Sequence, residues 1–198
     1  MDAVFDGGFA DPTRDSQTSF RAIMDALANP GTPRRLAESA LAVGPLGAEL
    51  VNTLLTLSDA DTPIWLSDSL RVSSVEAFIA FHTGAPLTRE PGRASFALVA
   101  NLNELPKLEQ FNLGTQEYPD RSTTVVLQVA SLTGGPELIS RGPGIKDHGH
   151  FAPVGLPQDF IHQWSANREK FPRGIDLLLV ADGQVMGLPR STRLSEGH

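Results

Sequence analysis

The sequence predicts an α/β protein, a three-layer α/β/α sandwich around one mixed sheet. Segments with apolar residues at helical spacing alternate along the chain with short apolar runs rich in β-branched residues, which is typical of this class. A late hairpin adds antiparallel pairs. With 198 residues, the chain can form one domain with a sizeable core but not two comfortable ones. We therefore expect a single domain over 1–198, with an irregular N-terminus at 1–12 and a frayed tail at 194–198.

Four segments carry the helical pattern. The first begins at a cap formed by Asp15 or Ser16 and runs to about Ala28, where the N-P-G sequence at 29–31 ends it. The others span about 45–58, 73–84 and 157–168, and Gly84 closes the third in a left-handed cap. Their expected buried sides comprise Phe20, Ile23, Met24 and Leu27; Leu46, Leu50, Leu54 and Leu57; Val75, Phe78, Ile79 and His82; and Phe160, Ile161 and Trp164.

Short apolar runs between these helices predict the strands. They lie at 62–66, 94–100, 123–132, 175–180 and 184–188, and a short helix interrupted at Pro106 is expected over 101–110. The run at 123–132 alternates imperfectly, so both of its faces should be covered, as in a central strand under helices. Residues 133–136 (T-G-G-P) then turn the chain into a short returning strand at 137–140.

Composition and charge exclude several classes of function. The net charge of −7 argues against a nucleic-acid partner, which would require a basic face, although a local arginine pocket could still hold a small phosphorylated ligand. The chain has no cysteine, and therefore no disulfide, thiolate nucleophile or cysteine–metal site. No apolar run approaches transmembrane length and the N-terminus lacks a signal core. We expect a cytoplasmic protein with no membrane partner.

A glycine-rich loop follows the strand at 137–140 and is the first candidate site. Arg141 precedes Gly142, Pro143 and Gly144, and backbone N–H groups of such a loop beside a guanidinium can cradle a phosphate. The spacing fits neither a P-loop nor a dinucleotide-binding fingerprint. The alternative is a tight loop that requires its glycines for shape, and the residues alone leave both interpretations open.

Two further arginines adjoin turns of the same character. Arg173 lies in F-P-R-G at 171–174, shortly before Asp176, and Arg190 lies in P-R-S-T at 189–192. His148 and His150 have a spacing compatible with a metal, but no third ligand stands nearby, so we expect a solvated loop and no metal site. General catalytic patterns such as G-x-S-x-G and H-E-x-x-H are absent, and the catalytic residues stay unknown.

An ordered set of short motifs resembles one protein family along nearly the whole chain. They are Q-T-S-F-R at 17–21, N-P-G at 29–31, L-L-T-L at 54–57, D-T-P-I-W-L at 61–66, F-H-T-G-A-P-L at 81–87, L-Q-V-A-S-L at 127–132, G-P-G-I at 142–145, F-P-R-G-I-D-L at 171–177 and P-R-S-T at 189–192. Each motif is weak alone, but the set in this order is specific. The chain resembles the PhnH family, subunits of the bacterial carbon–phosphorus lyase system.

The resemblance implies a fold, partners and a reaction. The family's fold resembles a reduced type I pyridoxal-phosphate-dependent transferase without the cofactor. Its members form homodimers alone and assemble with the G, I and J subunits. With G, I and L they are required for transfer of ribose triphosphate from ATP to methylphosphonate with release of adenine, in phosphonate catabolism. The resemblance implies no catalytic residue for this subunit, which we expect to be inactive alone.

The lysines agree with a domain that binds no pyridoxal phosphate. Such an enzyme needs a lysine for its Schiff base, and Lys107, Lys146 and Lys170 all lie in polar loops or at helix ends. Two classes of function therefore stay open. Arg141, Arg173 and Arg190 would contact triphosphate or phosphonate oxygens in a shared active site, or the subunit only scaffolds the complex and these turns shape an interface.

Overall fold

A computed structural model describes residues 8–38 and 40–197, so part of the expected irregular N-terminus, residues 1–7, lies outside the described chain. Within these residues, the main sheet has seven strands in the order β1-β9-β8-β5-β4-β2-β3. Their bounds are β1 Arg34–Arg35, β2 Ile64–Leu66, β3 Leu87–Thr88, β4 Phe96–Val99, β5 Thr124–Gln128, β8 Asp176–Ala181 and β9 Gln184–Leu188. Strands β3, β2, β4, β5 and β8 run parallel, whereas β9 and β1 add antiparallel pairs. The prediction of a mixed sheet is confirmed.

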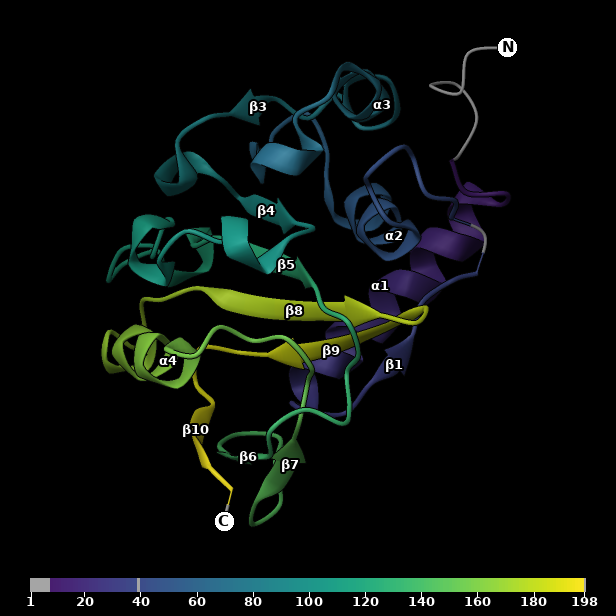
Figure 1. Cartoon of the computed structure of the whole chain (residues 1–198). Helices are drawn as coiled ribbons and strands as arrows, with labels where there is room; N and C mark the ends of the chain where they lie inside the picture. Colours follow the sequence, from purple (N-terminus) through teal and green to yellow (C-terminus); the bar gives the residue numbers. More distant parts are fainter. Residues whose placement is uncertain (1–7, 39, 198) are drawn as a thin grey trace.

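Helices cover both faces of this sheet (Figure 1). Three pack on one face, namely α1 Pro12–Ala28, α2 Ala48–Leu57 and α3 Ser73–His82. Helix α4 Phe160–Glu169 and the short 3-10 turn η4 Leu108–Gln110 pack on the other. The remaining short turns include η1 Asp68–Leu70 and η3 Leu102–Glu104. The expected short helix at 101–110 is thus two separate turns, because Pro106 interrupts it.

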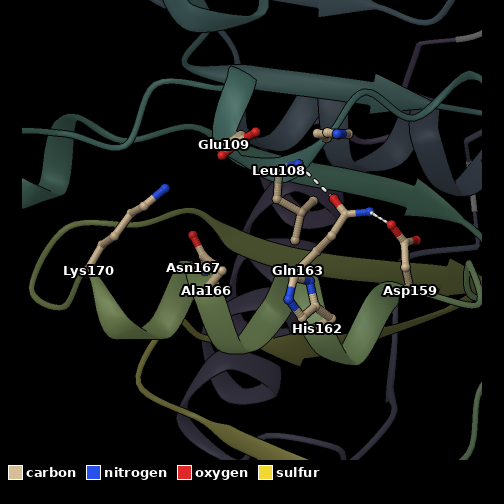
Figure 2. Close-up of a pocket in the computed structure, with 9 residues that line it drawn as sticks. Leu108, Glu109, Asp159, His162, Gln163, Ala166, Asn167 and Lys170 are labelled. Atoms are coloured by element: carbon tan, nitrogen blue, oxygen red, sulfur yellow. Dashed lines mark hydrogen bonds between the residues drawn. The ribbon is translucent and has the colours of Figure 1, made fainter.

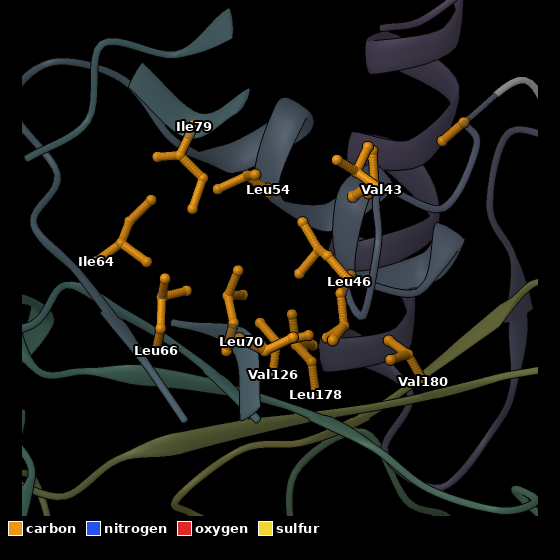
Figure 3. Close-up of a cluster of buried hydrophobic side chains, with 14 of the residues drawn as sticks. Val43, Leu46, Leu54, Ile64, Leu66, Leu70, Ile79, Val126, Leu178 and Val180 are labelled. Atoms are coloured by element: carbon orange, nitrogen blue, oxygen red, sulfur yellow. The ribbon is translucent and has the colours of Figure 1, made fainter. Parts of the chain in front are cut away.

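Alternate residues of the central strands enter opposite cores. Val126 of β5 and Leu178 of β8 face the helices α1 to α3, with Leu46 and Leu54 (Figure 3). Val125 of β5 instead faces α4 in the second cluster. The prediction that both faces of the central strand are covered is confirmed, because β5 is the fourth of seven strands and its inner residues are fully buried.

Helix α1 is rotated relative to the predicted stripe. Ile23 is buried as expected, but Phe20 and Met24 are 48% and 49% exposed. The reason is close packing: Ala26 contacts β9 where Gly187 has no side chain, and a Cβ there would lie 2.6 Å from the Ala26 carbonyl. The buried side of α1 therefore comprises Ser19, Ile23 and Ala26, and Phe20 and Met24 face outward. The prediction that Phe20 and Met24 belong to the buried stripe is wrong.

The cap of α1 also differs from the prediction. Asp11, rather than Asp15 or Ser16, is the N-cap, and its Oδ1 accepts the N–H of Arg14 at 3.1 Å. Pro12 occupies the first helical position, where a missing N–H is tolerated.

A second, three-stranded sheet contains segments that the sequence misassigned. Its order is β10-β6-β7, with β6 Leu138–Arg141, β7 Gly149–Phe151 and β10 Arg193–Glu196. The strand at 137–140 does not return onto β5, and residues 194–196 are paired rather than frayed. Residue 198 lies outside the described chain. Long-range pairing with β6 orders this tail, whose own sequence has little strand character.

Within the described residues, no helix is long and apolar enough to cross a membrane.

Candidate functional site

The structure places Asp176 and Arg190 in one ion pair. Asp176 begins β8 and Arg190 follows β9, so the β8–β9 hairpin brings the two side chains together. Arg190 Nε donates to Asp176 Oδ1 at 3.1 Å, and Nη2 donates to Oδ2. The backbone N–H of Arg190 also donates to Oδ1, at 2.8 Å. This two-pronged geometry satisfies both carboxylate oxygens.

The third guanidinium nitrogen of Arg190 also has a partner. Nη1 donates to the Pro119 carbonyl at 2.6 Å and lies 3.4 Å from that of Pro172. The side chains of Arg190 and Asp176 are only 13% and 20% exposed. Arg190 therefore ties three turns of the protein together. Each of its three guanidinium nitrogens donates within the chain, which favours a structural role for Arg190 over contact with a ligand or partner.

Arg173 lies near this pair but does not join it. It follows Pro172, and its backbone N–H donates to the Lys170 carbonyl at 3.0 Å. Its side chain is exposed, and makes no hydrogen bond or ion pair with the described residues. A ligand or partner role for Arg173 stays a prediction.

Arg141 has a neighbour that the sequence did not indicate. It ends β6 and lies directly opposite Arg193 of β10 in antiparallel register. Both side chains are exposed, and within residues 8–38 and 40–197 neither has an ion-pair partner. Opposite side chains in such a pair have Cβ atoms about 4.5–5.5 Å apart, and like charges there repel. The Arg141–Arg193 pair is thus a local concentration of positive charge on an acidic protein.

The segment that carries Arg193 is held in place from behind. Trp164 of α4 donates its Nε1–H to the Thr192 carbonyl at 2.9 Å. Gly142 lies against the same segment, since a Cβ there would meet Ser191 O at 3.2 Å. The backbone next to Arg141 and Arg193 is therefore fixed by these contacts. The side chain of Arg190, on the same segment, contacts Asp176 instead. The six sequence candidates form two groups, one around Asp176–Arg190 and one around Arg141.

Two histidines lie at β7 of the small sheet, His150 within the strand and His148 just before it. His150 of β7 pairs in register with Ile139 of β6, and its Nδ1 lies 2.6 Å from Glu137 Oε1. The His148 ring lies 5.4 Å from that of His150. The segment expected as a solvated loop is therefore partly a strand, with His150 in contact with a carboxylate.

The glycines of the loop have a packing reason of their own. Gly144 adopts φ +80°, and a Cβ there would overlap the carbonyl oxygen of Ala28 at the end of α1. Gly142 adopts φ +152° against Ser191. Both positions require glycine without any ligand, which favours the interpretation that these residues shape the loop. Phosphate contact by their N–H groups stays a prediction.

A small cleft between η4 and α4 contains two of the three lysines (Figure 2). Its volume is about 140 Å³, and Lys107 and Lys170 line it. Gln163 bridges its floor, because Oε1 accepts the N–H of Leu108 at 3.0 Å and Nε2 donates to Asp159 Oδ2 at 2.8 Å. These polar groups hold η4 onto α4, so the floor of the cleft is structural.

Comparison with known proteins agrees with the family resemblance of the sequence motifs. A model of the family described as "Bacterial phosphonate metabolism protein (PhnH)" matches residues 7–195. The chain belongs to the PhnH family. It is 50% identical, over 191 residues and 96% of both chains, to the "Alpha-D-ribose 1-methylphosphonate 5-triphosphate synthase subunit PhnH" of Rhizobium meliloti (strain 1021). It is 31% identical, over 90% of this chain and 85% of the relative, to the "Putative C-P lyase subunit protein HtxG" of Stutzerimonas stutzeri.

Proposed function

We propose that the chain is a subunit of an α-D-ribose 1-methylphosphonate 5-triphosphate synthase within a carbon–phosphorus lyase complex. The observation that carries this proposal is 50% identity over 96% of both chains to a protein of that name. With the G, I and L subunits, the complex transfers ribose triphosphate from ATP to methylphosphonate and releases adenine. The subunit assembles with G, I and J and works in the cytoplasm.

In that complex, the Arg141–Arg193 pair binds an anion. Its two guanidinium groups are exposed, adjacent and without a carboxylate among the described residues. Arginine binds phosphate or carboxylate oxygens through paired N–H donors, which lysine does not reproduce. The anion is either a phosphate of the substrate or a carboxylate of a neighbouring subunit, and these alternatives correspond to a shared active site and to an assembly role.

A reconstitution experiment separates the alternatives. The chain is co-purified with the G and I subunits, and adenine release from ATP and methylphosphonate is measured after addition of L. Arg141→Ala and Arg193→Ala should melt like the wild type, because exposed groups contribute little to stability. Intact assembly with lost turnover indicates a shared active site, and lost assembly indicates an interface.

The matched control is Arg89→Ala. Arg89 is an exposed arginine just beyond β3, at the opposite edge of the main sheet. It should change neither assembly nor turnover. If Arg141→Ala and Arg193→Ala behave like Arg89→Ala, the pair has no role in the complex. If the complex with the wild-type chain releases no adenine, the proposed function itself is wrong.

A non-catalytic assembly role has an observation of its own. Phe20 and Met24 are both about half exposed and lie one turn apart on the outer side of α1. Exposed apolar surface of this kind is a feature of protein interfaces. We propose that it is covered in a homodimer or by a neighbouring subunit. Light scattering at micromolar concentration tests the homodimer, and a monomer would contradict it.

The fold and the lysines support a domain without pyridoxal phosphate. We propose a reduced type I transferase fold in which the cofactor lysine is missing. Lys107 and Lys170 line the η4–α4 cleft, and Lys146 lies in the turn between β6 and β7. None of the three follows a strand of the main sheet directly. A lysine-dependent absorbance band after incubation with the cofactor would contradict this proposal.

A further inference from the structure

The carboxyl ends of β4 and β5 meet at a crevice outside the groups described so far. The two strands are parallel neighbours, with Val99 opposite Leu127, so their following residues diverge at the same edge of the sheet. The crevice has a volume of about 580 Å³. Its lining comprises Pro45, Ala100, Asn101, Leu102, Asn103, Gln128, Val129, Ala130 and Gly155.

The crevice lies one strand away from the point where the strand order reverses, which is between β2 and β4. Strand β2 is flanked by β3 on one side and by β4 on the other. The connection after β2 passes through α3 on the α1–α3 face, whereas the connection after β4 passes through η4 on the α4 face. In open parallel sheets, ligands bind outside the carboxyl ends of the strands at such a reversal.

The crevice is polar but has no charged side chain among its nine lining residues. A phosphate would find no arginine or lysine there. The nearby start of α2 already has an acidic group, because Glu49 lies in its first turn and accepts the Gly183 N–H at 2.8 Å. The chemistry therefore favours an uncharged ligand.

Gln128 is the group available to such a ligand. It ends β5 half-buried, and its carboxamide makes no hydrogen bond with residues 8–38 or 40–197. The amide lies against Gly47, where a Cβ would be 2.8 Å from Oε1 and 2.9 Å from Nε2. The missing side chain at Gly47 thus leaves room for the carboxamide at the rim of the crevice, with one donor group and one acceptor unpaired.

Hydrogen bonds hold the loop that forms the opposite wall. Glu104 at the end of η3 accepts hydrogen bonds from the backbone N–H and hydroxyl of Ser69, at 2.9 and 2.8 Å. These bonds tie the loop after β4 to the loop after β2. Asn101 Oδ1 accepts the N–H of Asn103 at 3.1 Å, which orders the wall residues of this loop.

We propose that this crevice binds an uncharged, planar nitrogen heterocycle, with Gln128 pairing to its edge. A carboxamide offers a donor and an acceptor side by side, which matches the adjacent amino group and ring nitrogen of adenine. The proposal deepens the proposed function and rests on it, because adenine is the group that the complex removes from ATP. Gln128 binds and orients the base, and the charged Arg141–Arg193 pair is a separate site.

Equilibrium dialysis of the isolated chain against adenine tests the assignment. The wild type should retain adenine, and Gln128→Leu should weaken retention by about tenfold or more, the usual effect of losing a paired base contact. Gly47→Ala should also weaken it, because the added Cβ displaces the carboxamide without changing any group that touches the ligand. Gly47 has φ −61°, which alanine adopts without strain. Dimethylation of the adenine amino group should weaken binding to the wild type.

Gln116→Leu is the matched control, because Gln116 is exposed and lies in the turn before Tyr118. It should bind adenine like the wild type. The inference is overturned if the wild type retains no adenine at millimolar concentration, or if folded Gln128→Leu and Gly47→Ala both bind like the wild type. Adenine release by the reconstituted complex is measured separately, so turnover by a wild-type chain that binds no adenine would overturn the inference and leave the proposed function standing.

Discussion

Removal of the Arg190 side chain should destabilise the fold substantially. Arg190→Ala deletes the donors Nε and Nη2 to Asp176 and Nη1 to the Pro119 carbonyl. It also leaves the Asp176 carboxylate, only 20% exposed, with its backbone contact alone. Removing one partner of a buried ion pair costs about 3–5 kcal/mol, and this pair is not fully buried, so we expect about 3 kcal/mol.

Thermal unfolding converts this into a large shift. A change of 1 kcal/mol moves Tm by about 2–4 °C in a domain of this size, so Arg190→Ala should melt roughly 6–12 °C lower. Urea titration monitored by circular dichroism gives the free energy of unfolding independently. A double-mutant cycle with Asp176→Ala should show a coupling free energy of about 1 kcal/mol or more, because the two side chains share their hydrogen bonds.

Arg173→Ala is the control, since Arg173 is exposed and sits in the neighbouring turn. Its side chain has no described partner, so its Tm should stay within about 2 °C of the wild type. If Arg190→Ala melts like Arg173→Ala, the ion pair is not structural. Arg190 would then be free for a ligand or partner, as the turn pattern alone suggested.

Three further substitutions test other parts of the structure. Phe20→Ala should cost only about 1–1.5 kcal/mol, because the ring is about half exposed, whereas Ile23→Ala should cost about 2–5; equal urea midpoints for both would show that α1 is misoriented. Gly144→Ala should lower Tm markedly, because φ is +80° and Ala28 fills the Cβ position; an unchanged Tm would contradict that packing. The N–H and hydroxyl of Ser69 hold the Glu104 pKa below its ordinary value of 4.5. Because the pKa is lower in the folded state, the Glu104 carboxylate stabilises the fold at pH values above its unfolded-state pKa, and this stabilisation is lost as pH falls through the folded-state pKa. Glu104→Gln should therefore lower Tm at pH 7, and its Tm should converge with that of the wild type in acid. A Tm difference that does not depend on pH would contradict this.

The main sheet could be predicted because its strands carry their own signal. Runs such as 123–132 are dense in β-branched residues, and the hairpin at Asp182 and Gly183 is local. In the small sheet, β6 was predicted as a strand, but β7 and β10 lack such a signal because they are short and mixed in polarity. The pairing of β10 with β6 joins residues more than 50 positions apart, such as Arg141 and Arg193, so the local sequence does not indicate it.

The candidate sites could likewise be predicted only in part, because their contacts join distant segments. The arginine-containing turns were visible in the sequence, but whether a guanidinium meets a carboxylate depends on the register of distant strands. Asp176 and Arg190 were both candidates, yet only the β8–β9 hairpin shows that they bind each other. Gln128 carried no sequence signal, because an unpaired carboxamide becomes apparent only once its neighbours are in place.

Among the described residues, the positive charge of the arginine side chains is neutralised within the chain at Arg190 but not at the Arg141–Arg193 pair. At Arg190, the chain supplies its own anion, and the guanidinium is nearly sequestered from water. At the Arg141–Arg193 pair, repulsion between facing like charges has no compensating carboxylate among the described residues. An anion that binds there relieves the repulsion and stabilises the folded chain according to its concentration relative to Kd. Arg190 therefore acts within the subunit. In the function proposed above, the substrate or a neighbouring subunit provides the negative charge for the Arg141–Arg193 pair.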